Sequence, residues 1–188
     1  QMGASFEGLG DVDDRLPLRV TGGELKAFDY DSPVASAQVK SALLLAGLCA
    51  GVPVQITEPG ASRDHTERIF RGLGVNVITH VQGPGVRIEM RDPPERIPEL
   101  ELDVPGDLSS AAFVILAALL GIAPGPVWIE NVGVNPTRHG VLGLFTRMGA
   151  RIEITEEREV GGEPVASIVA SHSDLDAIEV GHADVAAA

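Results

Sequence analysis

Three short polar segments of this 188-residue chain stand where helices are expected to begin. They are residues 36–38 (Ser-Ala-Gln), 62–64 (Ser-Arg-Asp) and 107–110 (Asp-Leu-Ser-Ser). Serine and aspartate side chains commonly cap the free amides of a first helical turn. The same amides, together with the helix dipole, also bind phosphate or carboxylate groups. Each segment therefore has two interpretations, a structural cap or an anion site, and for Asp107 and Ser109 we favour the cap.

The distribution of charge favours an anion site at the first two segments. The whole chain holds 14 Lys and Arg against 27 Asp and Glu, a formal net charge of -13. Residues 36–75 hold four cations and three acids, a net charge of +1, so the remainder carries -14. A very acidic chain has thus lost its acidity around two helix starts, where a phosphate would be repelled least.

Composition and motifs exclude several other functions. Such an acidic chain lacks the basic surface that nucleic acid or an anionic membrane requires, so we expect neither as a partner. The longest apolar run, residues 111–123, is about 13 residues and too short to span a bilayer. Five scattered histidines show no metal-ligand spacing, and no Walker loop, dinucleotide-binding motif or nucleophile elbow occurs, so we expect no metal and no cofactor. The single cysteine, Cys49, excludes an internal disulfide, and its apolar surroundings predict a buried, inert thiol.

The elements that carry the polar segments form an internal repeat. Residues 36–79 and 107–154 share one order: a small-residue helix start, an apolar helix, a Gly/Pro turn, a strand, a loop, an amphipathic helix and another strand. The copies are offset by about 72 to 75 residues, with Ala46 opposite Ala118 and Phe70 opposite Phe145. Counting an extended segment before its first helix, each copy is expected to be β-α-β-α-β-β.

Hydrophobic patterning predicts how these elements pack. Residues 38–48 are apolar on nearly every side, which predicts a helix buried all round and covered by neighbouring units. A second, amphipathic helix over 64–72 is expected to direct Phe70 inward and Glu67 toward water. Residues 75–79 and 86–90 are expected to pair as antiparallel strands across a Gly-Pro-Gly turn.

A proline-rich segment between the copies predicts a crossover near residues 92–106. We expect an α+β fold divided into the end of a preceding unit (1–30), one unit of a first domain (31–100), one unit of a second domain (101–172) and the start of a further unit (173–188). The acidic segment 155–164 is expected to be a solvated loop. Because both ends of the chain look cut, we expect a fragment of a longer protein.

Several strings carry a resemblance to a known family. Residues 36–48 read SAQVKSALLLAGL, with TEP at 57–59 and SRDHTE at 62–67. Together with VPGDLSSAAF at 104–113 and NPTR at 135–138, they closely resemble 5-enolpyruvylshikimate-3-phosphate synthases (3-phosphoshikimate 1-carboxyvinyltransferases). The resemblance extends over nearly all of the chain, and the first string is highly specific.

The resemblance implies an inside-out α/β barrel type of fold, with two domains of three β-α-β-α-β-β units joined by two crossover strands, of which this chain is an incomplete part. It implies a cytoplasmic transferase of the shikimate pathway, which leads to chorismate and the aromatic amino acids. Such an enzyme transfers enolpyruvyl from phosphoenolpyruvate to the 5-hydroxyl of shikimate 3-phosphate, and needs no cofactor.

The same resemblance implies the site residues. Ser36, Ala37 and Gln38 would bind shikimate 3-phosphate, and Ser62 and Arg63 would hold its 3-phosphate. The family's Gly-Asp-Lys-Ser motif, Arg-Pro-Met segment and C-terminal basic residues do not occur in these 188 residues. We therefore expect no catalytic residue in this fragment, and no activity from the fragment alone.

Two alternatives stay open at this point. The related UDP-N-acetylglucosamine enolpyruvyl transferase has the same repeated units, although Cys49 does not resemble that enzyme's reactive loop cysteine and the Ser-Ala-Gln string favours the shikimate enzyme. A non-catalytic binding module, with helix caps and nothing more, could use the same repeat.

Overall fold

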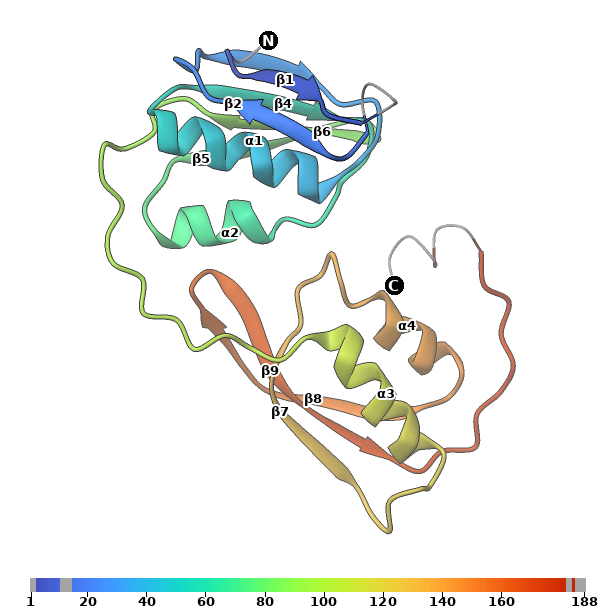
Figure 1. Ribbon diagram of the computed structural model, residues 1–188. Helices are drawn as coiled ribbons and strands as arrows, with labels where there is room; N and C mark the ends of the chain where they lie inside the picture. The colour runs from blue at the N-terminus through green and yellow to red at the C-terminus, as the bar shows by residue number, and fades with distance from the viewer. Residues whose placement is uncertain (1–2, 11–14, 182–183, 185–188) are drawn as a thin grey trace. The chain divides into compact units, whose positions relative to one another are not determined.

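A computed structural model describes residues 3–10, 15–181 and 184. The chain divides into two compact units, unit 1 (Gln1–Pro98) and unit 2 (Glu99–Ala188), each with its own sheet and helices (Figure 1). In the part of the chain that is described, no helix has the length and apolar character needed to cross a bilayer.

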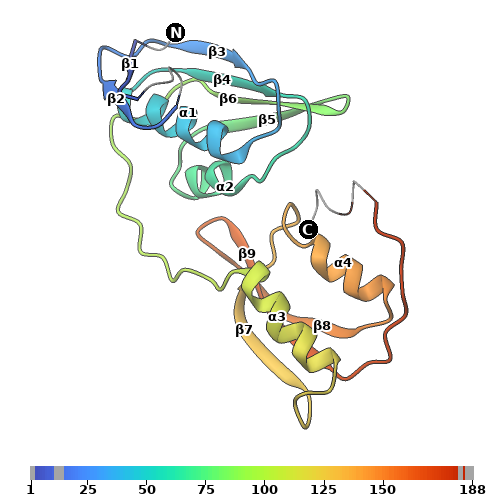
Figure 2. The same ribbon diagram turned by 45° about the vertical axis from the view of Figure 1, so that its right-hand side comes forward.

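Unit 1 contains a small two-stranded sheet and a larger sheet covered by two helices. The antiparallel pair of the small sheet is β1 (Ser5–Gly8) and β2 (Leu18–Thr21). The larger sheet consists, in spatial order, of β3 (Phe28–Asp31), β4 (Val54–Glu58), β6 (Gly85–Met90) and β5 (Val77–Gln82). Strands β3 and β4 are parallel and the other pairs antiparallel. Helices α1 (Ala37–Ala50) and α2 (His65–Gly72) lie on the same face of this sheet (Figures 1 and 2).

Unit 2 repeats this arrangement. Its elements are α3 (Leu108–Leu119), β7 (Val127–Gly133), α4 (Gly140–Arg147), β8 (Arg151–Val160) and β9 (Glu163–Ser171). The strand order β7-β9-β8 is antiparallel and matches β4-β6-β5 of unit 1. A parallel bridge between Gly106 and Val132 stands where β3 pairs with β4. The α+β class and the repeated order of elements are confirmed, with the first strand of the second copy reduced to this bridge.

Local sequence accounts for the ends of α1. The Ser36 hydroxyl caps the helix by accepting the Val39 N–H at 3.4 Å. The helix ends at Gly51, whose φ of 66° lies in the left-handed region that glycine adopts without strain, and Pro53 prevents its continuation. Inward residues of α1, β4 and β6, among them Leu44, Ile56 and Ile88, then form the core of unit 1.

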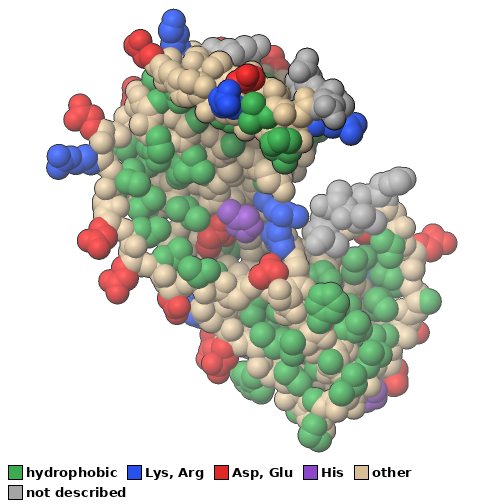
Figure 3. Space-filling model, in the orientation of Figure 1, with side chains coloured by type: hydrophobic (Ala, Val, Ile, Leu, Met, Phe, Trp, Pro, Cys, Tyr) green, Lys and Arg blue, Asp and Glu red, His purple; other side chains and the backbone are tan. Residues whose placement is uncertain are grey.

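The expectation that α1 is buried on every side is wrong for this chain. Val39 and Leu45 are 38% and 48% exposed, and Cys49, predicted to be buried, is exposed. In α3 the Phe113 side chain is 78% exposed. Apolar side chains gather over these helices on the surface (Figure 3). The apolar pattern therefore identified apolar faces correctly, but nothing within the described residues covers them.

The acidic segment 155–164 was also wrongly predicted to be a loop. Residues 155–160 belong to β8, and only the turn at Gly161 and Gly162 separates it from β9. Strand β8 lies at the edge of its sheet and pairs on one side only, so charged side chains can reach water without breaking the ladder. A bulge between Thr155 and Arg158, where Glu156 has φ of 53°, bends the strand.

Gly47 offers a test of the packing between α1 and the sheet. A Cβ atom there would clash with Val54 Cγ2, on a stiff β-branched side chain. We expect Gly47→Ala to lower the free energy of unfolding by about 1–3 kcal/mol through overpacking, despite alanine's higher helix propensity. The measurement is urea unfolding followed by circular dichroism.

The matched control is Gly143→Ala in α4, because a Cβ there meets nothing within 4 Å. It should raise the free energy of unfolding by roughly 0.5–1 kcal/mol. If Gly47→Ala stabilised the protein as much as Gly143→Ala, the close packing of α1 on β4 would be refuted.

Candidate functional site

Topology brings the first two polar segments together. Strands β3 and β4 are parallel, so the segment after β3, which leads to α1, and the segment after β4, which leads to α2, leave the sheet at the same edge. Ser36 and residues 62–64 lie on these two connections, and Ala37 and Gln38 begin α1 directly after the first. The predicted helix starts are therefore neighbours in space, although they are about 25 residues apart in sequence.

Glu58, the last residue of β4, joins the two segments. Its Oε1 accepts the backbone N–H of Ser36 at 2.9 Å. The Ser62 hydroxyl donates to the same carboxylate, with distances of 3.0 Å to Oε1 and 2.7 Å to Oε2. One buried side chain thus holds both the start of α1 and the loop before α2.

The Glu58 carboxylate belongs to a buried ionic cluster, Lys40–Glu58–Glu67. Lys40 Nζ lies 3.3 Å from Glu58 Oε2 and 2.8 Å from Glu67 Oε1, and all three side chains are 1–2% exposed. The prediction that Glu67 faces water is therefore wrong: its side chain reaches inward to Lys40. The second oxygen of Glu67 is buried without a hydrogen-bond partner among the described residues, so Lys40 carries most of the compensation for its charge.

The burial of this cluster changes the charge of the surface around it. Lys40, counted above among the cations of residues 36–75, does not reach that surface, and neither do two of the three acids. What remains is three arginines against one aspartate, Asp64, which pairs with Arg68 at 2.9 Å. Arg71 donates to the Val77 carbonyl. The surface of this segment is therefore more cationic than the sequence count indicates.

The predicted site residues differ in how they are held. Ser36 and Ser62 are joined through Glu58, whereas Gln38 and Arg63 are exposed. Among the described residues, no hydrogen bond uses the N–H of Ala37 or of Gln38, and none involves the Arg63 guanidinium. The start of α1 therefore offers two free amides beside an exposed arginine, the set of donors that an oxyanion requires.

The sequence analysis missed the cluster, although the sequence contains a signal for it. Lys40 is the single charged residue of α1, and a charge within an apolar helix must find a buried partner. In β4 every second side chain, those of Val54, Ile56 and Glu58, faces the core, so Glu58 lies on the same buried face as its two apolar neighbours. A lysine and a glutamate that both fall on the inward face indicate an ion pair.

The third polar segment is closed by its own carboxylate. Asp107 caps α3 by accepting the Ser110 N–H at 3.1 Å and the Ser110 hydroxyl at 3.0 Å, which confirms the predicted cap for Asp107, whereas the Ser109 hydroxyl accepts from Arg138. Arg138, in the position that Arg63 has in the first copy, lies 3.0 Å from Asp107 and also donates to Ser109. Burial raises the pKa of the Asp107 carboxyl, but the hydrogen bonds from Ser110 and Ser109 and the charge of Arg138 lower this pKa overall. An internal anion thus occupies this helix start.

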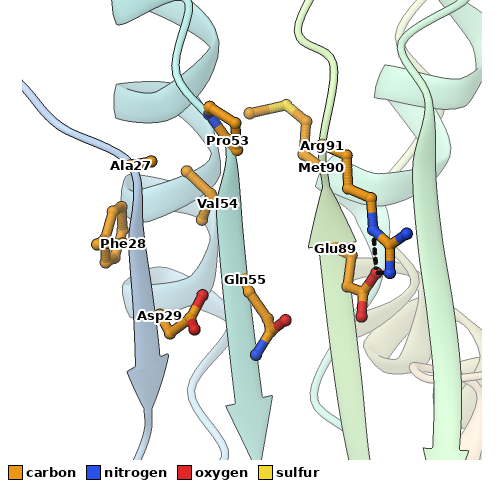
Figure 4. Close-up of a pocket in the computed structure, with 9 residues that line it drawn as sticks. All are labelled: Ala27, Phe28, Asp29, Pro53, Val54, Gln55, Glu89, Met90 and Arg91. Carbon is orange, nitrogen blue, oxygen red and sulfur yellow. Dashed lines mark hydrogen bonds and ion pairs between the residues drawn. The ribbon is translucent and has the colours of Figure 1, made fainter.

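A second candidate, a pocket of about 110 Å³, lies on the other face of the unit 1 sheet. Asp29, Gln55 and Glu89 lie side by side there on three neighbouring strands (Figure 4). Glu89 is paired with Arg87 and Arg91 at 2.7 Å and 2.6 Å. Burial raises the pKa of Glu89, but these two arginines and His80 lower it overall. Because Glu89 is already paired with the arginines, we assign this pocket no binding function. Across the described ranges, no group of three or more His, Cys, Asp or Glu side chains could hold a metal.

Comparison with known proteins finds similarity to one family. The family model of EPSP synthase (3-phosphoshikimate 1-carboxyvinyltransferase) matches residues 1–188. The 3-phosphoshikimate 1-carboxyvinyltransferase of Geobacter sulfurreducens is 46% identical over 186 residues, which cover 96% of this chain and 41% of that protein. The enzyme of the same name from Acidithiobacillus ferrooxidans is 50% identical over 169 residues, 89% of this chain and 37% of that protein.

A solved structure, EPSP synthase from Acinetobacter baumannii, superimposes with a TM-score of 0.80 at 39% identity. The match covers 99% of this chain and 41% of that one. The chain therefore spans about two fifths of the length of the relatives that it resembles.

Lys40 tests the buried cluster. We expect Lys40→Met to lower the free energy of unfolding by about 3–5 kcal/mol, because two buried carboxylates would face each other without a cation. The chain has one other lysine, Lys26, which is exposed, and Lys26→Met should change the free energy of unfolding by less than about 0.5 kcal/mol. Equal stability of the two variants in urea unfolding would contradict the cluster.

Proposed function

The chain belongs to the EPSP synthase (3-phosphoshikimate 1-carboxyvinyltransferase) family, and from this membership we propose that it forms one side of the shikimate 3-phosphate site of such an enzyme. The observation that carries the proposal is the start of α1. There the free amides of Ala37 and Gln38 stand beside Ser36 and Ser62, which Glu58 holds together. Amides at a helix start and an arginine fork suit a dianionic phosphate.

We assign each predicted residue a part in this site. Ser36, Ala37 and Gln38 bind shikimate 3-phosphate, and Gln38 also contacts the phosphoenolpyruvate side. Ser62, through its backbone N–H because its hydroxyl hydrogen already goes to Glu58, and the Arg63 guanidinium hold the 3-phosphate. The exposure of Arg63 and the excess of arginine on this surface support the assignment, since an exposed guanidinium keeps its N–H donors available to an anionic ligand.

The reaction proposed for the parent enzyme is transfer of enolpyruvyl from phosphoenolpyruvate to the 5-hydroxyl of shikimate 3-phosphate. C3 of phosphoenolpyruvate gains a proton, and the 5-hydroxyl attacks C2 and loses its own. The resulting tetrahedral intermediate then loses phosphate and the proton at C3. General acid and base groups are needed for these transfers, and we assign none to the present 188 residues. The setting is the shikimate pathway in the cytoplasm.

We further propose that the two units belong to two domains of the parent enzyme. Residues 1–30 end a preceding unit, 31–100 and 101–172 form one unit in each domain, and 173–188 begin a further unit. The division between Pro98 and Glu99, within the predicted crossover, supports this assignment. The exposed apolar faces of α1 and α3 also support it, because further units would cover them.

The first test concerns the chain by itself. We expect the purified 188-residue chain to release no phosphate from shikimate 3-phosphate and phosphoenolpyruvate, because the acid and base groups lie outside it. The control is the full-length protein under the same assay. Turnover by the chain alone would contradict the proposal that the acid and base groups lie outside it. An inactive full-length protein would contradict the proposed reaction.

The second test concerns Arg63 in the full-length enzyme. Arg63→Ala should weaken binding of shikimate 3-phosphate by roughly 1.5–3 kcal/mol, the contribution typical of a charged hydrogen bond, as measured by calorimetric titration. Arg71→Ala is the matched control, since Arg71 lies in the last turn of α2, where it bonds to Val77 and Thr79. If both variants bind with the affinity of the unaltered enzyme, Arg63 has no part in the site.

A further inference from the structure

Glu58 joins three partners that come from different parts of unit 1. Its two oxygens receive the Ser36 N–H, the Ser62 hydroxyl and the Lys40 ammonium, and its side chain is 1% exposed. Two of these partners are residues of the proposed phosphate site. The third, Lys40, lies one turn after Ser36 along α1 and is itself held by Glu67.

Stability alone gives a weak reason for this cluster. Two carboxylates and one ammonium must be stripped of water, and apolar residues of similar volume often stabilise a core as well as a buried ion pair does. The cluster does provide geometry, because a carboxylate fixed by an ammonium accepts hydrogen bonds in set directions. The two hydrogen bonds that Glu58 accepts come from Ser36, at the start of α1, and from Ser62, in the loop before α2, and these two segments carry the proposed phosphate-binding groups.

We propose that Glu58 is a positioning residue of the shikimate 3-phosphate site, an inference that rests on the proposed function. It fixes the start of α1 through the Ser36 N–H and the loop before α2 through the Ser62 hydroxyl. It thereby sets the distance between the free amides of Ala37 and Gln38 and the guanidinium of Arg63. Glu58 acts through these groups and does not itself touch the ligand.

The second copy of the repeat supports this assignment by contrast. At its corresponding helix start, the carboxylate of Asp107 lies on the surface. It accepts a hydrogen bond from the Ser110 N–H and forms an ion pair with Arg138. In the first copy the carboxylate is buried beneath the helix start, and the arginine of the loop stays exposed. The buried carboxylate of the first copy therefore joins the connections that hold Ser36 and Ser62, and it leaves the N–H donors on the surface unoccupied.

Two substitutions separate geometry from charge in the full-length enzyme. Glu58→Gln keeps the length of the side chain and an acceptor oxygen, and leaves Lys40 paired one to one with Glu67. Glu58→Asp keeps the charge but shortens the side chain by one methylene, so that it cannot reach both Ser36 and Ser62. If Glu58 positions the site, Glu58→Asp raises the KM for shikimate 3-phosphate by at least about tenfold, and Glu58→Gln, which keeps the reach of the side chain but loses its charge, raises it by a smaller factor.

The KM for phosphoenolpyruvate at saturating shikimate 3-phosphate should change less than the KM for shikimate 3-phosphate in both variants, because Gln38 is the one positioned residue that we assign to the phosphoenolpyruvate side. Glu89→Gln is the matched control, because Glu89 is equally buried in the same sheet but faces the opposite side. Its KM for shikimate 3-phosphate should be that of the unaltered enzyme. An Asp variant that binds no more weakly than the Gln variant overturns the positioning role.

Coupling to Arg63 provides a second readout. Because Glu58 is proposed to act through the placement of Arg63, Glu58→Asp and Arg63→Ala together should weaken binding by less than the product of their separate effects. If Glu58→Asp does not fold, as judged by circular dichroism, Ser62→Ala replaces it in this cycle, since it releases the loop without disturbing the buried charges. Full additivity overturns the inference. A full-length enzyme that does not bind shikimate 3-phosphate would instead refute the proposed function.

Discussion

The structure around the candidate site depends on a shortage of positive charge in the interior of unit 1. One lysine, Lys40, serves two buried carboxylates, and these carboxylates come from β4 and from α2. Three elements of the unit therefore meet at a single ammonium group. If any of these three elements moved, a buried charge would lose its partner in a medium of low polarity. The cluster therefore restricts how the two helix starts can be placed. The hydrogen bonds from Ser36 and Ser62 to Glu58 extend this restriction to the surface.

The two copies of the repeat show how one topology supports different chemistry. Each has a helix that starts after a connection on the same edge of its sheet, and each has an arginine in the following loop. In unit 2 an acidic cap, Asp107, satisfies both the helix and Arg138. In unit 1 the cap is the neutral Ser36, and Arg63 stays exposed. A difference of one residue type at the cap thus decides whether a helix start is filled from within or open to a ligand.

Much of this arrangement could be predicted from sequence, because hydrophobic periodicity and glycine or proline breaks determine elements locally. The helices over 38–48 and 64–72 and the strand pair after them were predicted within a few residues. Glu67 was misplaced because amphipathic patterning assumes that charged residues face water, and this assumption fails where a buried lysine offers a partner. The burial of α1 was overestimated because periodicity indicates that a face is apolar, not that a cover is present. That Glu58 joins Ser36 to Ser62 depends on strand pairing, which no local pattern contains.

The most direct test of this account is a crystal structure of the full-length protein with shikimate 3-phosphate bound. The account predicts that phosphate oxygens lie about 3 Å from the N–H groups of Ala37 and Gln38 and from the Arg63 guanidinium. It also predicts that the buried Glu58 carboxylate still accepts the hydrogen bond from the Ser36 N–H when the ligand is bound. A phosphate bound away from the start of α1, or a Glu58 side chain turned away from Ser36 in the complex, would contradict it.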